Sequence, residues 1–161
     1  MTSILKFCQD LPTVRFNPGD VLLAEGDRSG KLYLLIDGEV EVLKGDYQIN
    51  VVSEPGAIFG EISALLDLPH MATVRATAET SAYVADSGSG LLQSNKEIAY
   101  HLSRMLAQRL HGVTSYLVDL KSQFEDREDH LGMVDVVLES LLHEPVEEHT
   151  PGSDRYPDRS I

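Results

Sequence analysis

The stretch that decides the fold is Phe59–Ala76, F-G-E-I-S-A-L-L-D-L-P-H-M-A-T-V-R-A. Gly60 has no Cβ, so the backbone can turn there and pass close to a ligand. Glu61–Leu66 is predicted to form one or two helical turns, which Pro69 ends. A short helix after a glycine turn directs unpaired N–H groups at one spot, which suits phosphate. The M-A-T-V-R-A that follows alternates and predicts a strand.

This order of F-G-E, L-L, a short spacer and P-x-x-A-x-V-x-A closely resembles the phosphate-binding cassette of cyclic-nucleotide-binding domains. Such domains occur in the catabolite activator family and in cyclic-nucleotide-regulated kinases and channels. The resemblance continues in F-x-P-G-D-V-L-L-x-E-G, L-Y-L-L-I-D-G-E-V and P-G-x-I-F-G-E. It implies cAMP, cGMP or a related small anion as the ligand, and no cofactor. One departure stands out, since His70 occupies the position of the family arginine that pairs with the cyclic phosphate.

The resemblance also implies roles for individual residues. Backbone N–H groups of Gly60 through Ser63 would face phosphate oxygens, and Glu61 would accept a hydrogen bond from the ribose 2′-hydroxyl. A hydroxyl side chain of the long C-terminal helix could meet the base. The complete implied ligand-binding set is Phe59, Gly60, Glu61, Ile62, Ser63, His70, Met71, Ala72, Thr114 and Ser115.

Two other interpretations of the cassette stay open. A Gly-Glu pair before an apolar run indicates, on its own, a turn followed by a helix. Replacing the arginine with His70 removes a bidentate charge-assisted contact, about 1.5–3 kcal/mol, or roughly ten- to a hundredfold in affinity. The alternative function is therefore a degenerate cyclic-nucleotide fold that serves as a protein-interaction or assembly module with no nucleotide bound.

The predicted fold class is α+β, mainly β: a double-stranded β-helix or jelly-roll β-roll over residues 1–97. Short β-prone runs alternate with glycine turns, as in antiparallel sandwiches. A short helix over Met1–Leu11 precedes the roll. Asp37-Gly38 is predicted to be a tight hairpin turn between the strands Leu32–Ile36 and Val40–Leu43.

Residues 98–142 are predicted to be a helical dimerisation segment, followed by a disordered acidic tail over 143–161. Apolar residues at 3-4 spacing are typical of a coiled-coil seam, so we expect a homodimer. The alternative is a single helix packed on the β-roll. Gly132 and the charged run Glu125–Asp129 predict a bend or break. The seam residues are Leu106, Leu110, Val113, Leu117, Leu120 and Phe124.

Composition excludes several function classes. A formal net charge of −13 disfavours binding to nucleic acid and anionic membranes. The single cysteine, Cys8, rules out an internal disulfide framework and indicates a cytoplasmic protein. The spacing of the histidines does not suit a metal site, and nucleophile and Walker motifs are missing, so no enzyme is expected. About thirty residues follow Arg127, too few for a helix-turn-helix domain, so output is expected through a partner protein or dimerisation.

Overall fold

The computed structural model describes residues 3–123 and 128–143. The chain forms two compact units, Met1–Met105 and Leu106–Ile161. The predicted disordered tail lies outside the described residues except for His143, so its disorder stays a prediction.

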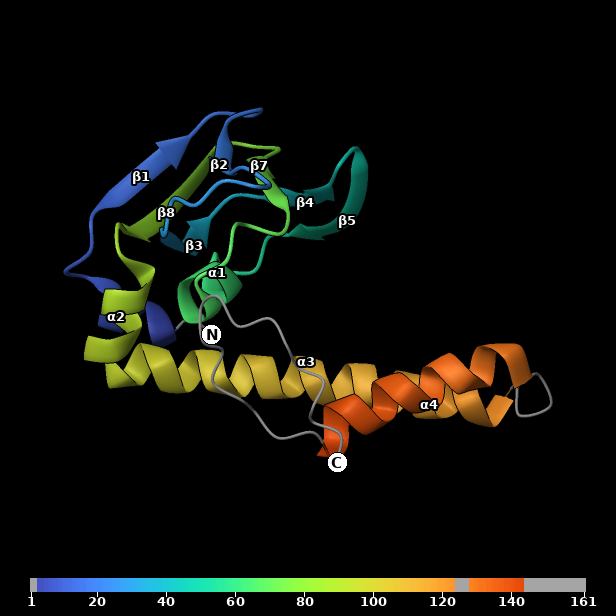
Figure 1. The fold of residues 1–161 in the computed structure, drawn as a ribbon. Helices are drawn as coiled ribbons and strands as arrows, with labels where there is room; N and C mark the ends of the chain where they lie inside the picture. The colour runs from blue at the N-terminus through green and yellow to red at the C-terminus, as the bar shows by residue number, and fades with distance from the viewer. Residues whose placement is uncertain (1–2, 124–127, 144–161) are drawn as a thin grey trace. The chain divides into compact units, whose positions relative to one another are not determined.

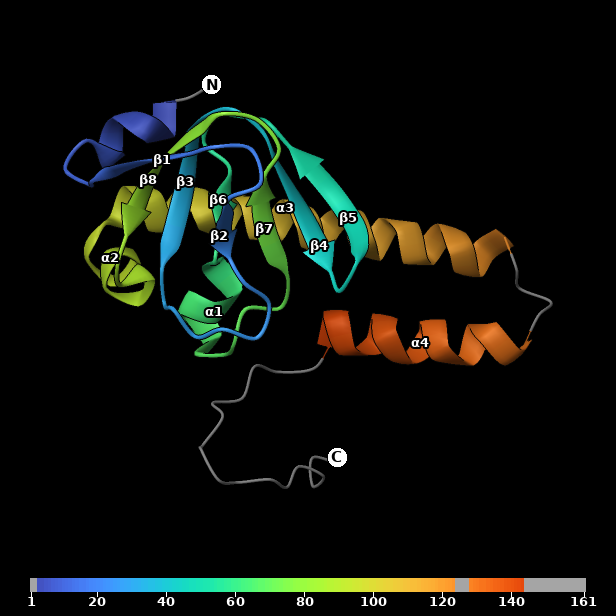
Figure 2. The same ribbon diagram turned by 90° about the horizontal axis from the view of Figure 1, so that it is seen from above.

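The first unit is built on two four-stranded antiparallel sheets (Figures 1 and 2). One sheet has the order β1-β8-β3-β6 and the other the order β2-β7-β4-β5. This arrangement confirms the predicted β-roll. The strands are β1 (Thr13–Phe16), β2 (Val21–Leu23), β3 (Leu32–Asp37), β4 (Val40–Lys44), β5 (Tyr47–Val52), β6 (Ile58–Phe59), β7 (Thr73–Ala76) and β8 (Thr80–Ala85).

The two sheets enclose one hydrophobic core. Burial alternates along β7, where Val74 and Ala76 are buried and Thr73 and Arg75 are half-buried, as expected for a strand with one face toward a core. Each fully buried leucine or phenylalanine contributes about 1.5–3 kcal/mol relative to exposure. The core consists of Leu22, Leu23, Tyr33, Leu35, Val40, Phe59, Val74, Ala76, Ala82 and Val84.

The hairpin predicted at Asp37-Gly38 is wrong. β3 pairs with β6 and β8, whereas β4 pairs with β5 and β7, so the chain crosses between sheets at this turn. Gly38 has φ 107°, and a Cβ there would lie 2.4 Å from Thr80 Oγ1 and 2.5 Å from the carbonyl oxygen of Glu79. Glycine is required because the crossing chain passes directly against the start of β8.

Helical segments complete the first unit. The N-terminal helix is a 3-10 helix, η1 (Ser3–Cys8), shorter than the predicted Met1–Leu11. It is hydrogen-bonded to the junction between α2 (Gly88–Ser94) and α3 (Lys96–Gln123) through Asn95 Nδ2, which donates to the carbonyl of Phe7 at 3.3 Å. Buried apolar side chains on these segments are Ile4, Cys8, Leu92, Ile98 and Leu102.

The second unit contains the rest of α3 and α4 (Glu128–His143), which run side by side (Figures 1 and 2). An ion pair between Lys121 and Asp135 joins them. α3 ends at Gln123 and α4 begins at Glu128, so the predicted break falls at the charged run Glu125–Asp129, whereas α4 continues through Gly132. Half-buried apolar side chains on the two helices are Leu106, Leu117, Leu120, Val134, Leu138 and Leu141.

The apolar seam is thus partly covered within one chain. Leu117 and Leu120 are half-buried, whereas Leu110 and Val113 remain 43% and 50% exposed. Phe124, the last predicted seam residue, lies outside the described residues. Within the described segments, no helix is both long and apolar enough to span a membrane.

Candidate functional site

The cassette forms as the sequence predicts. β6 leads into Gly60, α1 covers Glu61–Leu66, and β7 begins at Thr73. Gly60 is the N-cap of α1, and its carbonyl accepts a hydrogen bond from the N–H of Ala64 at 3.1 Å. The cassette therefore connects the two sheets, because β6 belongs to one sheet and β7 to the other.

Gly60 is required by the protein itself. Its φ is 95°, a left-handed conformation that side chains with a Cβ rarely adopt. A Cβ at Gly60 would lie 2.4 Å from the carbonyl oxygen of Lys31 and 3.4 Å from Leu23 Cδ1. The sequence analysis explained the missing Cβ by the close approach of a ligand. In the structure, protein atoms lie close to the position that a Cβ would take.

Asp67 is the C-cap that follows α1, and it is a non-glycine residue in the left-handed conformation with φ 57°. Its N–H donates to the carbonyl of Ser63 at 2.9 Å. The Asp67 carboxylate lies 3.7 Å from Arg28 Nη1, and both side chains are largely exposed, so this pair contributes little.

Asp67→Gly is therefore expected to stabilise the protein. Glycine adopts this conformation without strain, so the free energy of unfolding should rise by about 0.5–1 kcal/mol. Urea denaturation measures the change. Asp67→Ala keeps a Cβ and is the matched control, which should not stabilise the fold.

His70 lies inside the cassette, with 4% of its surface exposed. Its Nε2 lies 2.8 Å from Ser29 Oγ, and its Nδ1 lies 2.9 Å from Ser63 Oγ. In either neutral tautomer, one ring nitrogen donates to a serine and the other accepts from a serine. The backbone of His70 is held as well, since its N–H donates to the carbonyl of Asp27 and its carbonyl accepts from the N–H of Gly26, both at 2.8 Å.

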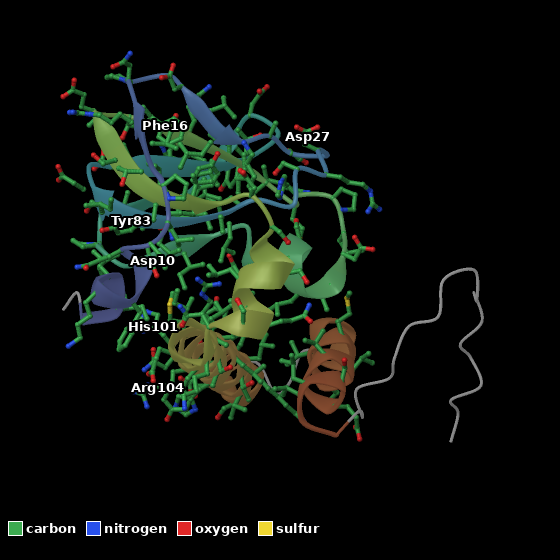
Figure 3. The ribbon with its side chains drawn as sticks, turned by 90° about the vertical axis from the view of Figure 1, so that its left-hand side faces the viewer. Asp10, Phe16, Asp27, Tyr83, His101 and Arg104 are labelled. Carbon is green, nitrogen blue, oxygen red and sulfur yellow. The ribbon has the colours of Figure 1, made fainter. Side chains whose placement is uncertain are left out.

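Burial lowers the pKa of His70, and the nearby Asp27 carboxylate raises it by a smaller amount. Asp27 lies on the loop between β2 and β3 (labelled in Figure 3). Folding therefore favours the neutral imidazole, the form that suits one donor and one acceptor contact to two hydroxyls.

The sign of this shift predicts a pH dependence of stability. The unfolded chain takes up the proton more readily, so stability from neutral His70 is present above a pH of about 6.5 and is lost as the pH falls. Wild type should lose stability more steeply than His70→Gln between about pH 7.5 and pH 5.5. Burial and the nearby Arg104 also lower the pKa of His101 (both labelled in Figure 3). Because both proteins contain His101, comparing them removes its contribution. Parallel curves would contradict the assignment.

The other implied site residues are distributed differently. Phe59 belongs to the hydrophobic core, and Glu61 and Ser63 are each 8% exposed. Ile62 and Ala72 are half-buried, and Met71 is 53% exposed. Thr114 and Ser115 belong to the second unit, and their role at a ligand base stays a prediction.

Sequence reasoning missed two contacts of the cassette. Ser29, which bonds His70, lies 41 positions earlier in the sequence. Lys44 Nζ donates to the carbonyl of Met71 at 2.9 Å and lies 3.1 Å from the Glu25 carboxylate. No local sequence pattern predicts either contact, because both depend on how distant strands are paired.

Residues 13–89 match the family of cyclic nucleotide-binding domains, and these residues span the β-roll and the cassette. The matched stretch covers just under half of the chain. The match ends at the start of α2, so it includes neither α3 nor α4.

Two named proteins with similar sequences are regulators. A cAMP-dependent protein kinase regulatory subunit from Hypocrea atroviridis is 39% identical over 88 residues, 55% of this chain and 18% of that protein. A CRP-like cAMP-activated global transcriptional regulator from Mycobacterium tuberculosis is 27% identical over 125 residues, 74% of this chain and 56% of that protein. The chain thus spans less than two thirds of either relative.

A solved structure supports the same fold. The catabolite activator protein of Thermus thermophilus superposes with a TM-score of 0.60 and 24% identity, over 74% of this chain and 58% of that chain. At this identity the likeness concerns the fold alone.

Proposed function

We propose that this protein is a regulatory sensor whose cassette takes up a small nucleotide-like ligand. Its output runs through α3 and α4, by dimerisation or by contact with a partner protein, and not through catalysis. The observation that carries the proposal is the cassette itself: a left-handed Gly60, a short α1 and a buried Glu61 within a matched cyclic nucleotide-binding domain.

A structural change at the cassette has a short route to α3, and this route begins at the loop Ser29–Lys31. Ser29 bonds His70, and the Lys31 carbonyl lies against Gly60, so the loop contacts the cassette at two points. The carbonyl of Gly30 accepts a hydrogen bond from the N–H of Gly88, the first residue of α2, at 2.8 Å.

α1 also contacts α2 directly. A Cβ at Gly88 would lie 2.9 Å from Ala64 Cβ, so the two helices approach closely at that point. Asn95 alone separates α2 from α3. A movement of α1 on ligand binding would therefore be transferred through α2 to the start of α3, since packed interiors do not absorb such shifts.

Calorimetric titration and amide hydrogen exchange on the full chain test this proposal. At least one of adenosine, guanosine, cAMP and cGMP should bind, and the bound protein should exchange more slowly in α1, α2 and the first turns of α3. Glu61→Gln is the matched variant, which should weaken binding with little change in thermal stability. Failure of all four compounds to bind would reject the sensor.

The second candidate is an assembly module with no nucleotide bound. Two observations favour it: His70 is fully engaged by serines, and the helices of the second unit expose apolar side chains. These exposed residues are Leu110, Val113, Tyr116, Val118, Met133, Val136 and Val137.

A homodimer is compatible with both candidates and has its own test. Leu110 and Val113 lie on the seam and stay exposed, so a second chain is the proposed cover. Wild type should sediment as a dimer, and Leu110→Glu with Val113→Glu should sediment as a monomer. Ser122→Glu, at an exposed position of α3 outside the seam, is the control. A wild type that is monomeric at high micromolar concentration would show that the seam residues pack only within one chain.

A further inference from the structure

His70 gives the cassette an uncharged group where the resembled family has a cation. The imidazole is 4% exposed, and its two ring nitrogens lie within 2.9 Å of Ser29 and Ser63. The lowered pKa of His70 is consistent with this neutral arrangement. The hydrogen-bonding capacity at this position is therefore that of hydroxyls and a neutral ring.

Two cations near the cassette lie beside protein carboxylates. Arg28 is 3.7 Å from the carboxylate of Asp67, and Lys44 is 3.1 Å from that of Glu25. Lys44 also donates to the Met71 carbonyl. Lys44 is thus held by two protein groups, whereas the exposed pair with Asp67 holds Arg28 weakly.

The Asp27 carboxylate adds to the unfavourable field for an anion, since it is close enough to raise the pKa of His70. A phosphate monoanion bound here would lose hydration and would meet a neutral imidazole in place of a cation.

The two serines differ in access. Ser63 is buried, whereas Ser29 is exposed on its loop, so the Nε2 side of His70 is the side that an incoming group can reach. A ligand hydroxyl can replace Ser29 Oγ on Nε2 with the same donor or acceptor role, since hydroxyls serve as both.

From these contacts we propose that the cassette selects an uncharged, hydroxyl-bearing ligand of the nucleoside class over the 3′,5′-cyclic monophosphate of the same base. The proposal rests on the proposed function, because it concerns the ligand of the same cassette. His70 and Ser29 determine the specificity: together they present neutral hydrogen-bonding groups to a ribose hydroxyl.

The test is calorimetric titration of the full chain with adenosine, guanosine, cAMP and cGMP at neutral pH. For wild type, one nucleoside should bind at least about tenfold more tightly than its cyclic monophosphate, the scale of one charge-assisted contact. His70→Arg should reverse the preference by restoring a cation. His70→Gln, which keeps a neutral donor and acceptor, should retain it.

The wild-type comparison alone decides if a variant does not fold. A cyclic monophosphate that binds wild type as tightly as its nucleoside, or more tightly, overturns the inference and leaves the sensor function standing. Binding of cyclic monophosphates by His70→Arg, with no nucleoside binding by wild type, overturns the inference as well. If no compound binds either protein, the sensor function fails together with the inference.

Discussion

Gly60→Ala is expected to lower the free energy of unfolding by about 2–5 kcal/mol. The left-handed conformation costs a residue with a Cβ about 1–2 kcal/mol, and forced overpacking adds about 1–3 kcal/mol. Overpacking arises because the new Cβ would lie 2.4 Å from the Lys31 carbonyl oxygen, a backbone atom that cannot rotate away. Urea denaturation of the two proteins measures the difference.

Gly19→Ala is a matched control. Gly19 has the same φ of 95°, and a Cβ there would have no neighbour within 4 Å. This substitution should therefore cost about 1–2 kcal/mol, the conformational part alone. Equal losses for the two variants would mean that the contact with Lys31 does not fix the cassette against the β2–β3 loop.

His70→Ala is expected to cost about 2–4 kcal/mol of stability, because it leaves a cavity and a buried hydroxyl without a partner. The stranded hydroxyl is that of Ser63, which is 8% exposed; Ser29 is exposed and can bond to water. Chemical denaturation near pH 7.5 measures the loss while the imidazole of the wild type is neutral.

His70→Gln tests whether hydrogen bonding causes that loss. Glutamine offers a donor and an acceptor of similar reach, so it should recover at least half of the stability lost in His70→Ala. A loss within about 0.5 kcal/mol for His70→Ala, the range of ordinary surface substitutions, would show that the contacts to Ser29 and Ser63 do not support the fold.

Local sequence predicted the cassette well. The six residues of α1 are the predicted Glu61–Leu66, and β7 lies within the predicted strand. Gly60 and Pro69 bound these elements by their own backbone restrictions, which need no distant partner. The same locality explains why the β-roll class followed from the spacing of turns.

Pairing between distant segments was the part that local patterns could not provide. β3 and β4 are adjacent in sequence and each has strand character, but β3 pairs with β8, whose residues lie more than forty positions later. Ser29 meets His70 across a separation of 41 positions. A turn signal at Asp37-Gly38 specifies a change of direction, not the sheet to which the next strand belongs.

The helical seam illustrates a related limit. Apolar residues at 3-4 spacing predict that one face of α3 is covered, and Leu117 and Leu120 are indeed half-buried. The spacing does not identify what covers the face. α4 from the same chain runs beside the distal part of α3, and the proposed second chain would cover Leu110 and Val113.

The protonation state of His70 in the free protein tests the central claim most directly, because both the serine contacts and the choice of ligand depend on it. A long-range ¹H–¹⁵N spectrum of the imidazole at pH 6.5 distinguishes the forms; an unperturbed histidine is about half protonated there. We expect a predominantly neutral ring, with one protonated and one unprotonated nitrogen. A ring protonated on both nitrogens at that pH would contradict the account.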